Sequence, residues 1–156
     1  MRARDLAQDL PTVTPDDSAL TAARLIAGRQ LPGIAVVGPD GRPVAVLPAS
    51  QVLRRLVPGY IQEDPSLARV LDEVSADQLG AQALRDKLVR DLLPQAKHRV
   101  ELARVGGDAT VVECAAEMAR MRSPLLVVIE NGQAKGLLTA AHLLEVLLPP
   151  DQPSAK

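Results

Sequence analysis

The residues best suited to hold an anion lie close together in the second half of the chain. Lys97, His98 and Arg99 form a basic run, and Arg104 follows shortly after them. Lysine offers a compact positive charge and arginine a planar fork of donors, so together they can clamp a phosphate. The alternative interpretation is a solvated basic loop that binds nothing.

A glycine pair follows this basic stretch, just before an expected helix. Gly106 and Gly107 would let backbone amides approach an anion, and the positive end of a helix favours negative charge. Asp108 weakens this hypothesis, because its carboxylate would occupy the same positive end as a cap. A simple turn explains the glycine pair without a ligand.

Residue types that usually carry catalysis or bind metals are sparse. The two histidines, His98 and His142, do not belong to a set of cysteines and carboxylates at metal-ligand spacing. Cys114 is the single cysteine, so neither a disulfide framework nor a metal site follows from it. No nucleophile elbow, Walker loop or dinucleotide fingerprint occurs. We therefore expect a protein that is not an enzyme.

Composition argues against nucleic-acid binding and membrane insertion. The net charge is -1 over 156 residues, and Tyr60 is the only aromatic residue. A chain with this balance has neither a field that attracts nucleic acid nor aromatic platforms on which bases stack. The N-terminus lacks the apolar core of a signal peptide, and no apolar run approaches the length of a membrane span. We expect a cytoplasmic protein.

The elements that would position these residues occur twice in the chain. Arg4-Asp5-Leu6 returns as Arg90-Asp91-Leu92, and Asp40-Gly41 returns as Asn131-Gly132, each turn following an apolar run. Two copies are too few for a solenoid. They predict two similar units related by a pseudo-twofold axis, with a cleft between them.

Each copy predicts the element order β-α-β-β-α after a short helical turn that carries Arg-Asp-Leu. Asp-Gly and Asn-Gly favour tight hairpin turns, and the first long helix of each copy should begin at an Asp, Ser or Thr cap. The expected strands are 12–14, 34–37 and 43–47, then 103–105, 125–129 and 134–138; the helices start near Asp17 or Ser18, at Ala49, near Asp108 or Thr110, and at Ala140.

This order predicts a mixed α/β (α+β) fold with a helical insert between the two units. The expected boundaries are 1–58 for the first unit, 59–88 for the insert, 89–149 for the second unit and 150–156 for a frayed tail. In the insert, Asp64-Pro65 should start one helix with the apolar stripe Leu67, Val70, Leu71 and Val74, and a capping box at 75–78 should start another. The insert is either a connector packed on the main body or a partner surface.

The doubled unit resembles the tandem cystathionine-β-synthase-type (CBS) domain family. The resemblance rests on the helix from Thr110 to Met118 with its alanine pair, on Leu125–Val128 followed by Asn131-Gly132, and on Gly136-Leu-Leu-Thr139 at the end of a strand. The first copy matches more loosely in the same order. The resemblance covers both copies but not the insert.

The resemblance implies a disc-like pair of units with two clefts, which we expect to form a homodimer. It also implies a stand-alone regulatory role, in which a cleft binds an adenine nucleoside or nucleotide and the module adjusts a partner enzyme or transporter. The candidate ligands are AMP, ADP, ATP and S-adenosylmethionine, and no cofactor is required. The alternative is an interaction scaffold that has kept the fold and lost the ligand.

The resemblance also implies a site at the end of the last strand of each unit, where the family pattern is Gly-x-x-Thr/Ser-x-x-Asp. The second copy keeps Thr139 but has His142 in place of the aspartate, and the first copy has Pro48 and Gln51 at these positions. The second cleft is therefore the better candidate. Thr139 either lines the site or simply caps a helix. His142 would bind a ribose hydroxyl or, when protonated, a phosphate; otherwise it is an exposed helix residue.

Three apolar residues and one amide complete the set that the resemblance implies. Val105, Leu125 and Leu126 would form the walls of a pocket for the base, although core packing explains them as well. Gln51 can still hydrogen-bond a ribose hydroxyl, but without charge.

Overall fold

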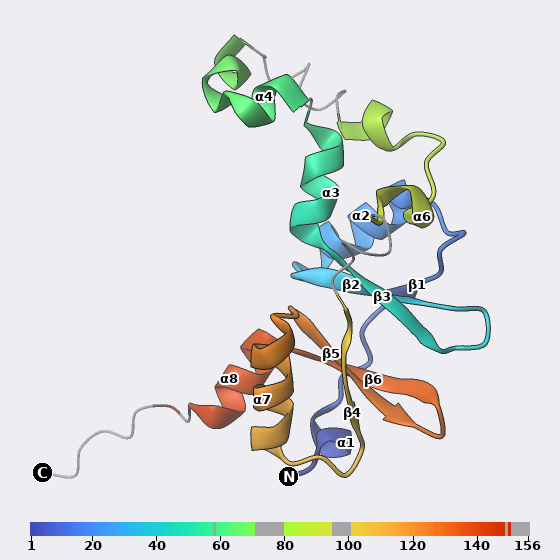
Figure 1. The fold of residues 1–156 in the computed structure, drawn as a ribbon, viewed down its shortest axis with the longest axis vertical. Coiled ribbons are helices and arrows are strands. Elements are labelled where there is room, and N and C mark those ends of the chain that lie inside the picture. Colours follow the sequence, from blue (N-terminus) through green and yellow to red (C-terminus); the bar gives the residue numbers. More distant parts are fainter. Residues whose placement is uncertain (58, 71–79, 95–100, 149, 151–156) are drawn as a thin grey trace, which may run out of the picture.

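The computed structural model describes residues 1–57, 59–70, 80–94, 101–148 and 150. Two units lie one above the other in Figure 1. The first unit holds β1 (Thr12–Val13), α2 (Ala19–Gly28), β2 (Gly33–Val37), β3 (Pro43–Pro48) and α3 (Ala49–Leu56); the second holds β4 (Ala103–Gly106), α7 (Val111–Met121), β5 (Leu125–Glu130), β6 (Gln133–Thr139) and α8 (Ala140–Leu147).

Each unit contains a three-stranded sheet with the same connections. In the first sheet β1 runs parallel to β2 and β2 runs antiparallel to β3; β4, β5 and β6 repeat this pattern. Val13 lies opposite Val36, and Val105 lies opposite Val128. The predicted fold class and the doubled β-α-β-β-α order are confirmed.

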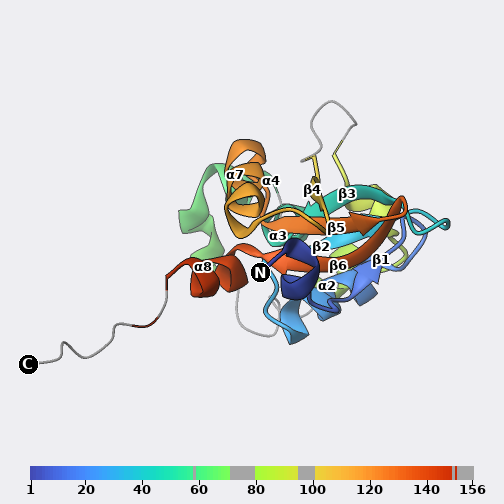
Figure 2. The same cartoon turned by 90° about the horizontal axis from the view of Figure 1, so that it is seen from below.

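The helix caps and hairpin turns form at residues suited to them. Of the alternatives, Ser18 and Thr110 are the caps: Ser18 Oγ accepts from the Thr21 amide and Thr110 Oγ1 from the Glu113 amide. Gly41 and Asn131 adopt positive φ angles of 80° and 55° in the two hairpins. Figures 1 and 2 show that both hairpins extend to the same side of the molecule.

The strands bury both faces because the two sheets also pack on one another. Side chains alternate along a strand, so Ile34 and Val36 face the helices of the first unit while Ala35 faces the second sheet. The residues between the sheets are Ala35, Val46, Leu102, Leu125, Val127 and Leu137.

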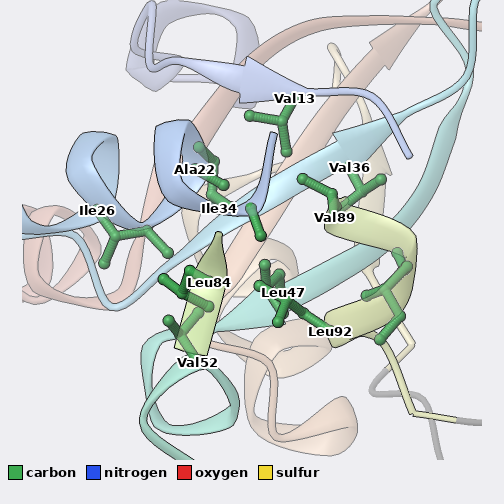
Figure 3. Packing of buried hydrophobic residues seen from close by; sticks show 13 residues of the cluster. Val13, Ala22, Ile26, Ile34, Val36, Leu47, Val52, Leu84, Val89 and Leu92 are labelled. Carbon is green, nitrogen blue, oxygen red and sulfur yellow. The ribbon is translucent and has the colours of Figure 1, made fainter. Parts of the chain in front are cut away.

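The short Arg-Asp-Leu helices are exchanged between the units, a feature that the repeat itself does not reveal. Helix α1 (Ala3–Leu6) buries Ala3 and Leu6 in the core of the second unit, and α6 (Val89–Leu92) buries its residues in the core of the first. Figure 3 shows Val89 and Leu92 among the apolar residues of the first unit. In Figure 1, α1 correspondingly lies beside β4 and α7.

The same hydrogen bonds hold both exchanged helices. The Ala3 amide donates to the Ala109 carbonyl at 2.8 Å, and at the equivalent place the Val89 amide donates to the Asp17 carbonyl at 2.8 Å. The next amide in each helix also donates across, from Arg4 to Gly107 and from Arg90 to Pro15. The exchange is therefore reciprocal and follows the pseudo-twofold symmetry.

This exchange explains why Arg-Asp-Leu recurs. The arginine reaches an acid before the first long helix of the other unit: Arg4 pairs with Asp108, and Arg90 pairs with Asp16. The aspartate caps its own helix by accepting from the amide three residues earlier, as Asp91 does from Leu88 at 2.8 Å. The leucine supplies the buried contact.

The insert begins with α4 (Gly59–Glu63) and a 3-10 helix, η1 (Pro65–Val70), and residues 80–84 are helical. Figure 1 shows α4 beyond the end of α3, away from both sheets. Leu84 is buried in the first-unit core, whereas Leu67 of the predicted stripe is 39% exposed. Leu71, Val74, the capping box at 75–78 and the tail at 151–156 lie outside the described residues.

None of the helices in the described part of the chain has the length and apolar composition that crossing a bilayer requires.

Candidate functional site

A cleft of about 500 Å³ opens between the units beside Thr139. Thr139 and the first residues of α8 form one wall, and the turn after α2 forms another, so both units contribute. The segment that follows α1 completes the lining. The lining residues are Gln8, Leu10, Arg29, Gln30, Leu31, Pro32, Pro124, Thr139, Ala140 and Ala141.

Thr139 serves as the N-cap of α8 and lines the cleft at the same time. It lies opposite Leu125 at the end of β6, and its Oγ1 accepts from the His142 amide at 3.1 Å. Because the hydroxyl acts only as an acceptor in this bond, its proton stays available for a ligand oxygen.

His142 lies on the first turn of α8, with its side chain 28% exposed. Its Nδ1 atom is 3.6 Å from Glu145 Oε2, which makes an ion pair only when the imidazole is protonated. The imidazole is not part of the cleft lining around Thr139.

Arg29 and Gln30 are lining residues that our sequence analysis did not single out. Helix α2 ends in a tight turn in which Gln30 has a φ of 51° and the Leu31 amide donates to the Ile26 carbonyl. This turn brings Arg29 to the cleft. No ion pair of Arg29 is seen among the described residues. The sequence feature that could have indicated these two residues is Arg29-Gln30-Leu31-Pro32, where a helix ends in polar residues directly before a buried strand.

Gly136 is required by packing rather than by a ligand. The segment after α1 pairs with β6 there: the amides of Gln8 and Leu137 each donate to the other's carbonyl, at 2.8 and 3.0 Å. A Cβ at Gly136 would lie 2.7 Å from the Ala7 Cβ, closer than real contacts allow. The glycine thus lets the segment carrying Gln8 and Leu10 reach the cleft.

The predicted apolar walls lie in the cores and not along the cleft. Leu125 is packed between the sheets and Leu126 in the second-unit core, and both are fully buried. Val105 is partly buried against the second-unit core. Core packing, the alternative given for these residues, accounts for their positions.

Gly106 and Arg104 lie on β4, away from Thr139. Gly106 pairs with Ile129 near the far end of β5, whereas Thr139 pairs with Leu125 at its start. The hollow around Gly106 contains Arg4, whose guanidinium is neutralised by Asp108 and Glu130 at 2.5 and 3.3 Å. A third carboxylate, Glu113, also lines this hollow, which makes the hollow unfavourable for an anion.

Gln51 lines a separate cavity in the first unit, together with Pro48 and Pro94. Its Nε2 donates to the Leu92 carbonyl at 3.1 Å, which ties it to an exchanged helix. Lys97 and Arg99 lie outside the described residues. Pro94, the last described residue before them, lines this first-unit cavity and not the cleft at Thr139.

Cys114 is a free cysteine buried in the core of the second unit. Burial raises the pKa of its thiol, and the nearby Glu113 carboxylate acts in the same direction. The thiol is therefore protonated and unreactive at neutral pH. Within the described residues, no three acidic, histidine or cysteine side chains come together where they could hold a metal ion.

Comparison with known proteins identifies the doubled unit. Residues 3–58 and 89–149 match the family model of the CBS domain. A CBS domain-containing protein from Kribbella flavida is 49% identical over 94% of this chain and 98% of its own, with a TM-score of 0.82.

More distant structures share the fold. The CBS domain of a membrane protein from Sphaerobacter thermophilus is 23% identical over 95% of this chain and 88% of its own, with a TM-score of 0.68. The protein CBSX2, solved in complex with AMP, is 16% identical over 94% of this chain and 96% of its own, with a TM-score of 0.64. No curated protein matches the sequence.

Proposed function

The chain belongs to the CBS domain family, and on this premise we propose that it is a regulatory module that binds an adenine nucleoside or nucleotide in the cleft beside Thr139. The observation that carries this proposal is the lining of the cleft. It brings a hydroxyl from the second unit and a guanidinium from the first to one hollow of about 500 Å³. A volume of this size suits a nucleotide.

Arg29 is suited to the anionic part of the ligand. Its planar guanidinium can hold two phosphate oxygens at once, and such charge-assisted hydrogen bonds are stronger than neutral ones. The family aspartate is replaced by His142, so the ribose loses a charged acceptor. Binding therefore depends more on the phosphate than it would with a carboxylate at that position. CBSX2, which shares the fold, binds AMP.

A ligand that bridges the two units changes how firmly they are held together. Thr139 belongs to the second unit and Arg29 to the first, so binding stabilises one relative arrangement of the units. This supports regulation of a partner enzyme or transporter and requires no catalytic step in the module itself.

The test is a titration with AMP, ADP, ATP, S-adenosylmethionine and adenosine, followed by thermal unfolding. A ligand at about 100 times its Kd adds about 2.7 kcal/mol to the free energy of unfolding. Arg29→Gln should weaken AMP more than adenosine, while Arg24→Gln on the same helix is the matched control. Thr139→Ser, which keeps a hydroxyl, should retain binding. If no adenine ligand shifts the transition at millimolar concentration, the proposal fails.

A second candidate function, an assembly scaffold, is favoured by exposed leucines at equivalent positions of the two units. Leu53 on α3 is 58% exposed and Leu144 on α8 is 53% exposed. Leu53 also borders an almost entirely apolar groove of about 360 Å³ between α2 and α3. Exposed apolar surface of this kind marks interaction sites. We propose that it supports a homodimer.

A further inference from the structure

The groove of about 360 Å³ between α2 and α3 is built to receive apolar side chains. Its α2 wall consists of a leucine and small alanines, and its α3 wall of larger aliphatic residues. The side chains that form these two walls are Leu20, Ala23, Ala27, Val52, Leu53 and Leu56. The insert adds Gly80 and Leu84 to the lining, and Figure 3 shows Leu84 beside Val52. The first unit therefore presents a hollow that the insert helps to form.

The second unit presents a row of exposed leucines on α8. Leu144, Leu147 and Leu148 are 53%, 39% and 67% exposed. Residues spaced by three and four positions lie on the same face of a helix, so the three side chains form one apolar surface, the α8 leucine face. This spacing is the one that a helix uses when it docks into an apolar groove.

The two surfaces carry opposite charges. Arg24 is the one charged side chain among the described residues that line the groove, and within those residues it makes no ion pair with a carboxylate. Glu145 is the only carboxylate of α8, follows Leu144 directly and is 78% exposed. Its described partner is His142, with Nδ1 at 3.6 Å, which is charged only when protonated. The groove thus has a free positive charge and the leucine face a negative one.

Both surfaces are accessible to one partner molecule. Figure 2 shows α3 and α8 on the same side of the molecule, away from the two hairpins. Because each chain carries a groove and a leucine face, a twofold axis between two copies can make the same contact twice and close the assembly.

We propose that the α8 leucine face of one copy docks in the α2–α3 groove of a second copy. The second unit of each chain then lies against the first unit of the other, which we call the crossed dimer. This inference rests on the homodimer proposed above and goes beyond it by stating which surfaces meet.

Charge favours the crossed dimer over a matched dimer, in which each unit faces its own counterpart. In the matched dimer, groove on groove brings the two Arg24 side chains toward each other, and leucine face on leucine face does the same with the two Glu145 side chains. Like charges brought together across an interface are unfavourable. In the crossed dimer each Arg24 meets a Glu145 of the other copy.

A charge exchange tests this pairing, with sedimentation equilibrium of the full chain measuring the dissociation constant of the dimer. Arg24→Glu and Glu145→Arg should each weaken the wild-type dimer about tenfold, because each places like charges across both contacts. The chain with both substitutions restores an attractive pair at each contact and should return to within about twofold of wild type. Both side chains are exposed in a single chain, so the variants should fold.

The control makes the same charge change away from the helices. Arg42→Glu, in the first-unit hairpin, should leave the dissociation constant within about twofold. The crossed dimer is overturned, and the homodimer stands, if the double variant dimerises as weakly as the single variants or if neither single variant weakens the dimer. A wild-type chain that stays monomeric overturns both proposals.

Discussion

At the scale of single residues, Gly136 shows how a family motif can serve the fold instead of the ligand. The glycine stands at the start of the Gly-x-x-Thr pattern, next to residues expected to touch a nucleotide. Its physical role is to let the Ala7–Gln8 backbone pack against β6. Packing alone can therefore require a residue that also belongs to a binding pattern.

Substitution of this glycine should destabilise the protein. Gly136→Ala places a Cβ 2.7 Å from the Ala7 Cβ, and overpacking of this kind costs about 1–3 kcal/mol of unfolding free energy. Gly106→Ala, on β4, is the control because nothing lies within 4 Å of its added Cβ. Urea unfolding measures both variants. Equal midpoints for the two would contradict this account.

The candidate site could be predicted from the sequence only in part. Thr139 was singled out because it stands in the family pattern Gly-x-x-Thr, and the structure places it in the lining of the cleft. Arg29 was not singled out, because its place in the same lining depends on how the first unit packs against the second, which no local pattern records. Gly106 shows the opposite case. Its local sequence favours an anion site, but Asp108 and Glu130 neutralise the guanidinium of the nearby Arg4.

At the scale of elements, the exchange of α1 and α6 is the main feature that periodicity could not predict. The strands follow the apolar runs closely: β2 and β5 fall within one residue of their expected bounds. Hydrophobic pattern and turn residues determine these elements locally. A four-residue helix such as α6 has too few residues for its pattern to indicate which core it joins.

Deleting the buried leucine of an exchanged helix should therefore weaken the opposite unit. Leu92→Ala should cost about 2–5 kcal/mol and speed amide exchange mainly in β1–β3 and α2, since Leu92 packs in the first-unit core. Leu6→Ala should speed amide exchange mainly in β4–β6 and α7, since Leu6 packs in the second-unit core. Hydrogen-exchange mass spectrometry at peptide resolution tests the pair. The result would contradict the swapped packing if Leu92→Ala sped amide hydrogen exchange only in the second unit and Leu6→Ala only in the first unit.

At the scale of the whole molecule, the two units are similar in fold and different in their open surfaces. The second unit contributes a hydroxyl to the cleft beside Thr139, while the first unit contains a cavity with two arginines and no carboxylate. Divergence at Pro48 against Thr139, and at Gln51 against His142, accounts for part of this difference. The insert, which supplies Gln62, accounts for another part.

Assembly of the whole chain should depend on the exposed leucines of α3 and α8. We expect the wild-type chain to be a homodimer, and Leu53→Glu with Leu144→Glu to be a folded monomer, because both side chains are largely exposed in a single chain. Each lost leucine contact removes about 1.5–3 kcal/mol of association energy. Light scattering after gel filtration measures the molar masses of the wild-type chain and of the double variant. Val44→Glu, on β3, is the control and should stay dimeric; a wild-type monomer would exclude the scaffold function.

The reciprocal exchange also suggests how such a chain could have arisen. Arg4 meets Asp108 across the interface as Arg90 meets Asp16, and the backbone bonds repeat in the same way. A single ancestral copy could make these contacts only with another molecule of itself, each lending its short helix to the other. Gene duplication and fusion would then have turned an obligate partnership between two molecules into one polypeptide. Once joined, the two halves no longer had to be identical, and each became free to change its own surface.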